Sequence, residues 1–410
     1  MNVTVIGAGV VGLAVGITLR HEAHDVSIID RLPPGEACSF GNSGAMPRYH
    51  ATPMATPGIL SKVPGYLIDP LGPLVLRARY FPQLIPWLIR FLAASAPGEF
   101  TKILDALTAL IRQSYEDWSD LIHSAKLEHL FENSGSVSLY RSKDDREHAW
   151  PLWQMAIDRG CRAEAVEGAA LRDLEPATPS AYGYGVYDPD YRRALDPFRV
   201  CIELAHYFES IGGHLHRENV AELELQQNRV TSIRTNKAQH DVDRVVIAAG
   251  AWSNELLKQL GYNVPLEAAR GYHVTLQNSG VSPRRVLLIS DMRMSLTPMN
   301  MGLRLGGSIE FAGLHAPPNF DRPAGQLKKL CRIYPELVTT NHTKWAGDRP
   351  LLPDSLPIID RCPRYANVIC AFGHGQYGLA LAAATGRIVA GIVADRPPPL
   401  NLAPYRLDRF

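Results

Sequence analysis

The sequence predicts an α/β fold in which a nucleotide-binding domain is interleaved with a second domain rich in β-strands. A strand, a glycine-rich turn and a helix open the chain at residues 2–23, and the same pattern returns at 368–393. Between them, residues 265–312 alternate in the manner of β-strands. Because the two halves of a nucleotide fold lie near opposite ends of the chain, we expect interleaved rather than sequential domains.

Length and composition limit the function classes. A chain of 410 residues predicts one large domain or two interleaved ones. The formal net charge of +1 argues against nucleic-acid binding, which usually needs a basic surplus. The cysteines form no CxxC pair, so we expect neither a disulfide framework nor a metal site, and a reducing, cytoplasmic compartment fits. They are Cys38, Cys161, Cys201, Cys331, Cys362 and Cys370. No segment spans a bilayer securely by length and hydrophobicity.

The stretch "VIGAGVVGLA" at residues 5–14 is a dinucleotide fingerprint by its context. It is not a signal peptide, since no basic residue precedes the apolar run and no clean cleavage site follows it. Gly7 suits the tight turn, Gly9 a close approach of backbone to pyrophosphate, and Gly12 close packing of helix on strand. The strand "DVSIID" ends in Asp30, an acid suited to a ribose hydroxyl. Since an acid disfavours a 2′-phosphate, FAD or NAD is favoured over NADP.

Two other glycine-rich stretches fit a bound cofactor. The strand "VVIAAGAW" (245–252) ends in small residues that let a ligand lie against the backbone, although a core strand with a turn explains it equally well. The stretch "FGHGQYGLALAAATG" (372–386) predicts a helix whose N-terminal N–H groups face developing negative charge. There we assign the function to the backbone and interpret the imidazole of His374 as a cap or a core group.

Arg349 lies in the proline-rich stretch "WAGDRPLLPDSLPIID" (345–360). A stiff loop would hold its guanidinium in one place, where the planar fork suits a carboxylate. The alternative is a structural ion pair with Asp348 or Asp354.

Residues 81–95 are apolar and aromatic, and the following segment predicts a long amphipathic helix.

In order along the chain, "VIGAGVVGLAVGITL", "SFGNSGAMPRYHATPMATPG", "VVIAAGAW", "GDRPLLPDSLPIID" and "GHGQYGLALAAATGRIVAGIV" resemble the D-amino-acid oxidase-like (DAO) superfamily of FAD enzymes. Among its members, bacterial D-amino-acid and hydroxyproline dehydrogenases are the most similar. The resemblance implies a glutathione-reductase-like FAD-binding domain, interleaved with a mixed β-sheet substrate domain. We place the former at 1–60, 186–264 and 345–410, and the latter at 61–185 and 265–344.

The resemblance also implies roles for single residues. The expected contacts of non-covalently bound FAD are Gly7, Ala8, Gly9, Val10, Val11, Gly12, Asp30, Arg31, Ser39, Asn42, Ser43, Gly44, Ala45, Val220, Ala249, Gly250, Trp252, Gly373, His374, Gly375, Gln376, Tyr377 and Gly378. Arg349 matches the family arginine that binds the substrate carboxylate. His50, Tyr272, His273 and Tyr377 are candidates for the pocket wall, each balanced against simple packing, and Tyr272 and Gln376 are candidates for catalysis beside Arg349.

Three positions depart from the family pattern. Gln376 stands where some relatives carry a second carboxylate-binding arginine, and Asp360 stands in "PIID" where many have glycine. Cys370 lies outside the context in which relatives attach flavin covalently.

The resemblance implies an FAD-dependent dehydrogenase of D-amino acids or cyclic imino acids, including D-proline and hydroxy-D-proline. A hydride passes from the substrate Cα to flavin N5, and a quinone takes the electrons. The aromatic segment at 81–95, with Arg77, Arg79 and Arg90, suits a membrane interface, although a helix packed in the substrate domain explains it as well. The alternatives are a peroxide-forming glycine or sarcosine oxidase, an FAD-binding subunit of a heteromeric amine dehydrogenase, and an NAD(P)H-using flavin monooxygenase.

Overall fold

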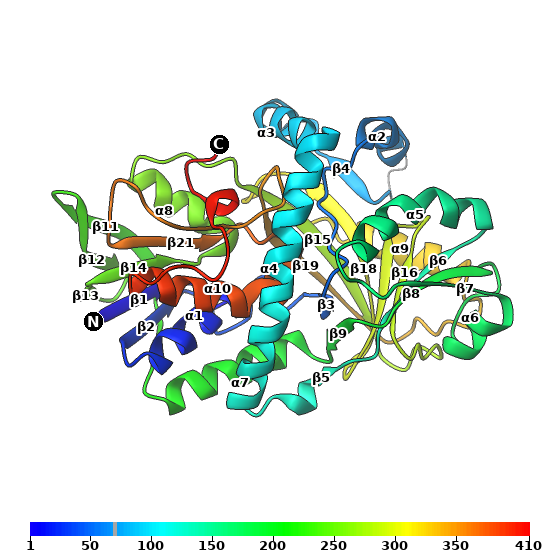
Figure 1. Cartoon of the computed structure of the whole chain (residues 1–410), viewed down its shortest axis with the longest axis horizontal. Helices are drawn as coiled ribbons and strands as arrows, with labels where there is room; N and C mark the ends of the chain where they lie inside the picture. Colours follow the sequence, from blue (N-terminus) through cyan, green and yellow to red (C-terminus); the bar gives the residue numbers. More distant parts are fainter. Residues whose placement is uncertain (69–71) are drawn as a thin grey trace.

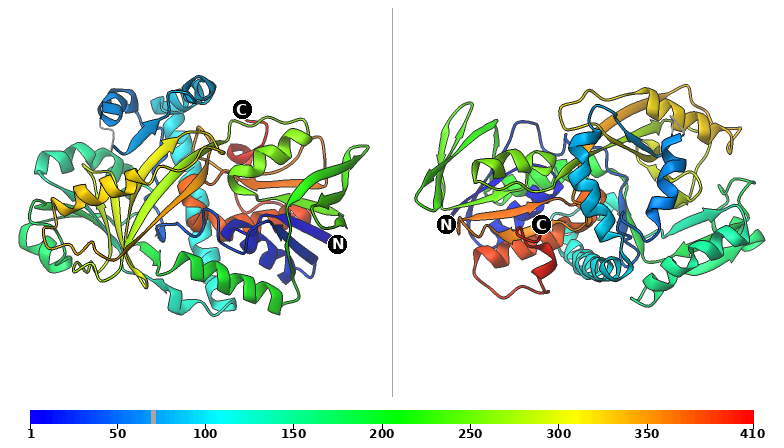
Figure 2. Two further views of the ribbon diagram at one scale, coloured as in Figure 1. Left: turned by 180° about the vertical axis from the view of Figure 1, so that it is seen from behind. Right: turned by 90° about the horizontal axis from the view of Figure 1, so that it is seen from above.

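The protein has two lobes, each built on its own large β-sheet (Figure 1). The structure is a computed structural model and describes residues 1–68 and 72–410. Each lobe draws on separate parts of the chain, so the chain passes repeatedly between them (Figure 2). The fold is therefore α/β with interleaved domains, as the two glycine-rich patterns predict.

The first lobe contains a six-stranded sheet in the order β10-β2-β1-β14-β21-β20. Its strands are β1 (Asn2–Ile6), β2 (Asp25–Asp30), β10 (His214–Arg217), β14 (Arg244–Ile247), β20 (Ile358–Arg361) and β21 (Val368–Phe372). All neighbours pair in parallel except β20 and β21. The central strands are buried along almost their whole length because both faces of a parallel sheet are covered. Their carboxyl ends meet at one edge, which is where open α/β sheets bind ligands.

Helices cover this sheet, and a small meander of three antiparallel strands extends it. The helices are α1 (Val10–His21), α7 (Pro197–Ser210), α8 (Ser253–Gln259) and α10 (Gly378–Val393). The strands of the meander are β11 (Val220–Gln226), β12 (Arg229–Thr235) and β13 (Gln239–Asp241). Glycine lets α10 pack closely on α1, since a Cβ at Gly386 would lie 2.8 Å from the carbonyl oxygen of Ala14. The stretch Gly375–Val393 is apolar and long enough to cross a membrane, but 72% of it is buried inside the protein.

Two consecutive helices fill the apolar segment and the amphipathic segment of the sequence. They are α3 (Phe81–Ala94) and the long α4 (Pro97–Ser124), which stands between the lobes (Figure 1). The indole of Trp118 donates to the carbonyl of Leu379 over 2.8 Å, so α4 is fixed to α10. Although α4 falls within the expected substrate-domain range 61–185, its buried face packs in the core of the first lobe.

The second lobe contains a nine-stranded sheet in the order β19-β15-β18-β17-β16-β6-β8-β7, with β4 paired to β18. Its strands are β4 (Leu74–Leu76), β6 (Ser136–Tyr140), β7 (Glu164–Glu167), β8 (Tyr184–Asp188), β15 (Glu267–Leu276), β16 (Val286–Ile289), β17 (Met294–Met299), β18 (Gly302–Phe311) and β19 (His342–Leu351). The helices of this lobe are α2 (Ile59–Ile68), α5 (Lys143–Ile157), α6 (Gly168–Leu174) and α9 (Asp321–Cys331). The expected domain boundary at 345 falls inside β19.

The two lobes meet at β19, the edge strand of the second sheet. It lies against two short 3-10 turns of the first lobe, Gly250–Trp252 and Gly375–Tyr377. The glycine-rich turns and the strand of Arg349 are thereby brought together. A further small sheet contains β3 (Ala45–Pro47), β9 (Tyr191–Ala194) and β5 (Phe131–Glu132).

Candidate active site

A cleft that is open to solvent follows the carboxyl edge of the first sheet. Its floor is the first glycine turn, where Gly7 has φ +118° and a Cβ would lie 2.3 Å from the carbonyl oxygen of Ala248. A Cβ at Gly12 would lie 1.9 Å from the carbonyl oxygen of Gly7, so only glycine permits this packing of helix on strand. At Gly9 the nearest atom to such a Cβ is the Ser39 hydroxyl at 3.3 Å. The cradle fits a pyrophosphate lying against the backbone at the N-terminus of α1.

Asp30 organises the turn as well as facing the cleft. One carboxylate oxygen accepts a hydrogen bond from the backbone N–H of Ala8 over 2.7 Å, and the other accepts from Leu32 over 2.9 Å. Beside it, the guanidinium of Arg31 lies 4.4 Å from the ring of Trp252, and both side chains line the cleft. This end of the cleft therefore has a fixed carboxylate and a planar aromatic surface, which suit a ribose and a flat base.

The last glycine turn closes the other side of the cleft. Gly375, Gly378 and Leu379 line it at the start of α10, so the first N–H groups of this helix face the cleft. The imidazole of His374 instead hydrogen-bonds the hydroxyl of Thr385 over 2.9 Å, and burial lowers its pKa to about 3. The backbone faces the cleft while the imidazole stays neutral in the core, which agrees with the interpretation from sequence.

Most of the residues expected to contact FAD line this single cleft. They are Gly7, Gly9, Val10, Val11, Asp30, Arg31, Ser39, Asn42, Val220, Ala249, Gly250, Trp252, His374, Gly375 and Gly378. The others do not line it: Ala8, Gly12, Ser43, Gly44, Ala45, Gly373, Gln376 and Tyr377. Ala8 and Gly12 serve the turn itself, as described above.

Arg349 lies on one face of the second sheet, with its guanidinium over Gly271 of the next strand. Since Ala269 is the direct partner of Arg349, side chains at 269, 271 and 273 share its face. A Cβ at Gly271 would lie 2.4 Å from the guanidinium carbon, so glycine makes room for the arginine. We call this side of the sheet the Arg349 face.

Neither expected carboxylate partner binds Arg349. Asp348 pairs with Arg270 over 2.9 Å and Asp354 with Arg409 over 2.7 Å. Within residues 1–68 and 72–410, the only hydrogen bond of the Arg349 guanidinium is a 3.3 Å contact to the carbonyl of Ser308. Burial lowers its pKa, yet an arginine stays charged in proteins. The site thus presents a partly buried cation that has no anion.

Tyr272, a candidate from sequence, lies on the other face of this sheet. Successive side chains of a strand point to opposite faces, so Tyr272 lies on the face away from Arg349. Its hydroxyl donates to Glu310 over 2.5 Å and accepts from the backbone of Asn319 over 2.8 Å. The hydroxyl of Tyr272 is thus engaged within the protein, and its role in substrate binding or catalysis stays a prediction.

Two candidate histidines are held by aromatic rings. His273 shares the Arg349 face and stacks on Trp345 at a centroid distance of 5.0 Å. Burial and the nearby Arg304 lower its pKa to about 3. His50 stacks on Trp153 at 3.7 Å, and burial lowers its pKa to about 4. Both are neutral at physiological pH.

The last two candidates differ in exposure. The hydroxyl of Tyr377 is bonded to the backbone N–H and carbonyl of Thr52 at 3.1 and 3.0 Å, so it fixes a loop. Gln376 is exposed and does not line the cleft. The hydroxyl of Tyr377 is thus already engaged, whereas the role of Gln376 as a second carboxylate contact stays a prediction.

Sequence reasoning missed Trp345 and Arg304. Trp345 lies over Gly41 and Gly347, where a Cβ would come within 2.0 and 2.1 Å of its ring. The alternation of Trp345, Gly347 and Arg349 in one strand could have indicated a shared face. Arg304 is remote in sequence from every motif, and no local pattern marks it.

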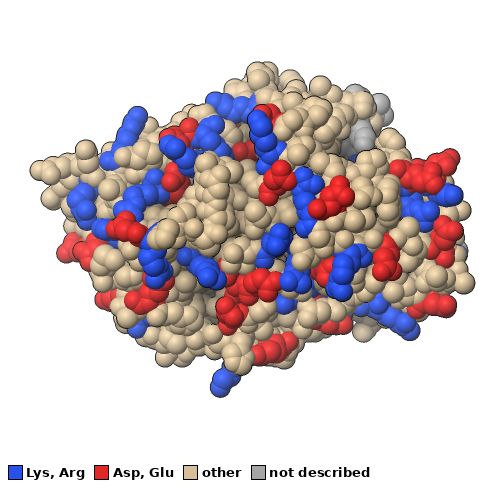
Figure 3. Space-filling view, in the orientation of Figure 1, with Lys and Arg blue, Asp and Glu red and all other residues tan. Residues whose placement is uncertain are grey.

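The charged side chains bear on two other classes of binding site. Figure 3 shows basic and acidic side chains interspersed on the face that it presents, with no continuous basic surface. In the part of the chain that the structure describes, no three His, Cys, Asp or Glu side chains are grouped to hold a metal ion.

Comparisons with known sequences agree with this cleft. The family model described as FAD dependent oxidoreductase, DAO, matches residues 2–392. A D-amino-acid oxidase from Bradyrhizobium diazoefficiens is 34% identical over 416 residues, covering 100% of this chain and 99% of the relative. A D-amino acid dehydrogenase from Paramagnetospirillum magneticum is 30% identical over 420 residues, with the same coverage.

Solved structures share the fold at low sequence identity. A glycine oxidase from Bacillus cereus superimposes with a TM-score of 0.76 at 18% identity, covering 100% of this chain and 99% of that one. An L-proline dehydrogenase from P. horikoshii gives 0.75 at 18% identity, covering 99% and 96%. The family model matches nearly the whole chain, and the glycine cradle and the Asp30 carboxylate agree with it. This protein therefore belongs to the DAO family of FAD-dependent oxidoreductases.

Proposed function

We propose that this protein is an FAD-dependent dehydrogenase of D-amino acids, with Arg349 as the residue that binds the substrate carboxylate. One observation carries the proposal: a partly buried guanidinium without an anion lies on the strand that contacts both glycine turns of the cofactor cleft. A planar guanidinium binds a carboxylate through two parallel hydrogen bonds. The printed names of the relatives, D-amino-acid oxidase and D-amino acid dehydrogenase, support the choice of substrate.

The side chains near Arg349 favour substrates with apolar side chains. Ala269, Phe311 and Leu351 are buried on the Arg349 face and pack with Trp87 of α3 and with Met54. A charged substrate side chain would lose its hydration against this wall without a partner. We therefore expect aliphatic and aromatic D-amino acids, and the cyclic D-proline and hydroxy-D-proline, to be better substrates than D-aspartate or D-lysine.

The residues of this chain bind and orient rather than exchange protons. When bound without a covalent link, FAD supplies the acceptor for the hydride of the substrate Cα. Arg349 fixes the carboxylate, and the N-terminus of α10 favours negative charge that develops in the cleft. The nearest histidines have low pKa values and are poor bases, so the substrate amine has to arrive neutral. We expect kcat/KM to rise with pH as the substrate ammonium loses its proton.

Anaerobic mixing of the yellow protein with single amino acids tests the proposal. We expect D-amino acids to bleach the flavin absorbance and their L-enantiomers and NADH to leave it unchanged. Bleaching by NADH alone would point to a monooxygenase. Bleaching by glycine or sarcosine with fast peroxide formation in air would point to an amine oxidase.

For the electron acceptor we propose a quinone, with the protein in the cytoplasm and in reversible contact with the membrane. The α3 helix exposes Phe81, Ile85 and Ile89 at one-turn spacing, with Arg90 also exposed. Exposed apolar residues flanked by basic ones suit the interface of an anionic bilayer. Figure 1 shows α2 and α3 projecting together from the body of the molecule. Arg77 does not contribute to this surface, because it pairs with Glu310.

Two measurements test the acceptor and the membrane contact. Reoxidation of the reduced protein should be faster with a soluble quinone analogue than with air-saturated buffer. Sedimentation with anionic liposomes should fall when Ile85 and Ile89 are changed to Ser, while the matched control Leu225→Ser, at an exposed leucine of β11, should leave it unchanged. If the purified chain bleaches with substrate but reduces no acceptor, it acts as one subunit of a heteromeric dehydrogenase.

A further inference from the structure

The loop that enters the cofactor cleft is attached to the substrate-domain sheet by one buried arginine. Arg304 of β18 is 4% exposed, and its Nη1 donates to the carbonyl of Asn42 over 2.6 Å and to that of Phe40 over 3.3 Å. Its Nε also contacts the hydroxyl of Thr275 on β15 over 3.4 Å. One guanidinium of the second lobe thus bridges two carbonyls of the first.

Two neighbours on the same sheet face support this attachment. Gly41 is the residue between those two carbonyls, and His273 of β15 pairs directly with Trp345 of β19. The ring of Trp345 covers Gly41 and stacks on His273. Three consecutive residues of the loop are therefore held against the Arg349 face.

The same loop supplies cofactor contacts on its other side. Ser39 and Asn42 both line the cleft. The Ser39 hydroxyl accepts from the N–H of Val10 in the first turn of α1 over 3.1 Å, and the side chain of Asn42 accepts from the N–H of Gly44 over 2.8 Å. Because Ser39 is bonded to the first turn of α1, a displacement of the loop would also shift or strain the pyrophosphate cradle.

Burial makes this use of an arginine costly. A guanidinium removed from water loses hydration that hydrogen bonds to carbonyls only partly replace. Among the described residues Arg304 forms no ion pair, and burial lowers its pKa to about 10 despite the influence of Asp196. Packing alone would not need a cation here, whereas the bridge uses Nη1 for the two carbonyls and Nε for the hydroxyl of Thr275.

We propose that Arg304 is a positioning residue for FAD: by bridging the carbonyls of Phe40 and Asn42, it fixes the cleft loop relative to Arg349. The orientation of the cofactor against the substrate then depends on a side chain that need not touch either of them.

Two variants test the proposal on the FAD-loaded protein. In Arg304→Met we expect FAD to dissociate about tenfold more readily on dilution, since a hydrogen bond to a charged group is lost. We also expect a shifted visible flavin spectrum, and a lower kcat with KM for the D-amino acid within about threefold, because Arg349 still binds the carboxylate. In Arg304→Lys, which keeps the charge and can reach one carbonyl, the changes should be intermediate.

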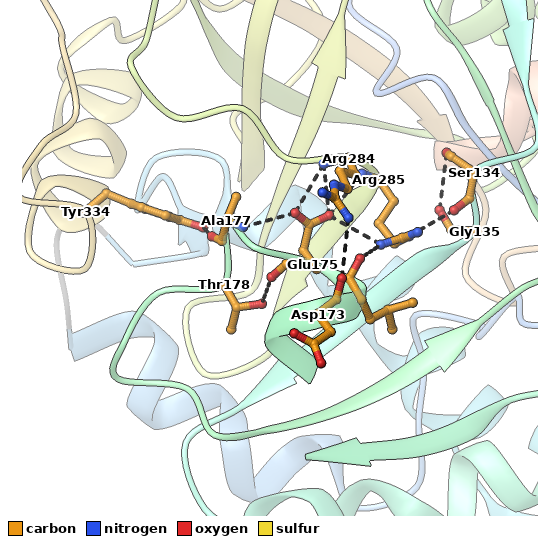
Figure 4. A network of polar contacts seen from close by, with 10 residues as sticks. Ser134, Gly135, Asp173, Glu175, Ala177, Thr178, Arg284, Arg285 and Tyr334 are labelled. Atoms are coloured by element: carbon orange, nitrogen blue, oxygen red, sulfur yellow. Dashed lines mark hydrogen bonds and ion pairs between the residues drawn. The ribbon is translucent and has the colours of Figure 1, made fainter. Parts of the chain in front are cut away.

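Arg285→Met is the matched control. Arg285 also binds carbonyls of the second lobe, donating to Ser134 over 3.0 Å and to Leu174, but it lies in the Glu175 network (Figure 4). We expect it to lower thermal stability without changing FAD release or the flavin spectrum. Wild-type FAD release and spectrum in both Arg304 variants, or changes no larger than those of the control, would overturn the proposal. These two readouts need no substrate, so they stand apart from the test of the proposed function.

Discussion

The cofactor cleft and the Arg349 face are built by different means. In the cleft, backbone groups and glycines do most of the work, and each contributing segment is a short turn whose conformation is set by neighbouring residues. On the Arg349 face, single side chains from β15, β18 and β19 are combined, and each sits between residues that point the other way. The first arrangement follows from local conformation, whereas the second exists only once the strands have paired in register.

The largest expected effect tests the Arg349 face. Arg349→Lys and Arg349→Ala should both lower kcat/KM for D-amino acids, by about 2–5 kcal/mol for the alanine, because a charge-assisted pair in a buried pocket is lost. Lysine cannot supply the bidentate fork. Steady-state kinetics measures the effect, and an unchanged flavin spectrum serves as the control. Near-normal kinetics in the lysine variant would show that the carboxylate binds elsewhere.

The second prediction concerns the stability of the second lobe. Asp188 of β8 is fully buried, and burial raises its pKa from 3.8 to about 6. A carboxyl whose pKa is higher in the folded than in the unfolded state binds an extra proton in the folded state. Stability therefore falls as pH rises from about 4 to about 6. Asp188→Asn should remove this slope and stabilise the protein at pH 8 by up to about 3 kcal/mol.

Denaturant unfolding of both proteins at pH 5 and pH 8 measures this difference. An equal change in stability at the two pH values would assign the effect to packing rather than to ionisation.

The third prediction tests the cleft. Asp30→Ala should weaken FAD binding by about 1.5–3 kcal/mol, since a carboxylate that faces the cleft and holds the glycine turn is removed. FAD fluorescence on release measures the affinity. Asp25→Ala, at the exposed start of the same strand, is the control and should bind FAD normally. An unchanged affinity in the Asp30 variant would remove the carboxylate from the ribose site.

The smallest effect sharpens the contrast between the two faces of the sheet. Tyr272→Phe removes hydrogen bonds to Glu310 and Asn319 on the far side, so it should cost about 1 kcal/mol of stability. Its kcat/KM should stay within about threefold of the wild type. A loss of kcat/KM comparable with that of the Arg349 variants would show that Tyr272 takes part in substrate binding or catalysis.

The same contrast explains which predictions from sequence held. The fingerprint of Gly7, Gly9 and Gly12 was readable because a positive φ and a near contact of Cβ with backbone exclude other residues locally. Arg349 was selected for its loop, but it lies in a strand, and its lack of a partner follows from Asp348 and Asp354 binding other arginines. Tyr272 and His273 are adjacent in sequence, and only the pairing of β15 decided which one shares the face of Arg349.

The sequence by itself determined the fold class, the nucleotide cradle and the FAD family, because glycine turns and strand–helix periodicity act over a few residues. Only the tertiary structure decided which side chains share the Arg349 face. In β18 a bulge at Gly307 shifts the register between Ser308 and Gly306, so Arg304 and Phe311 emerge on one face although their spacing alone places them on opposite faces. A one-residue shift in pairing reverses every later side chain of a strand, so the face on which Arg304 lies follows from the pairing of β18 with β15.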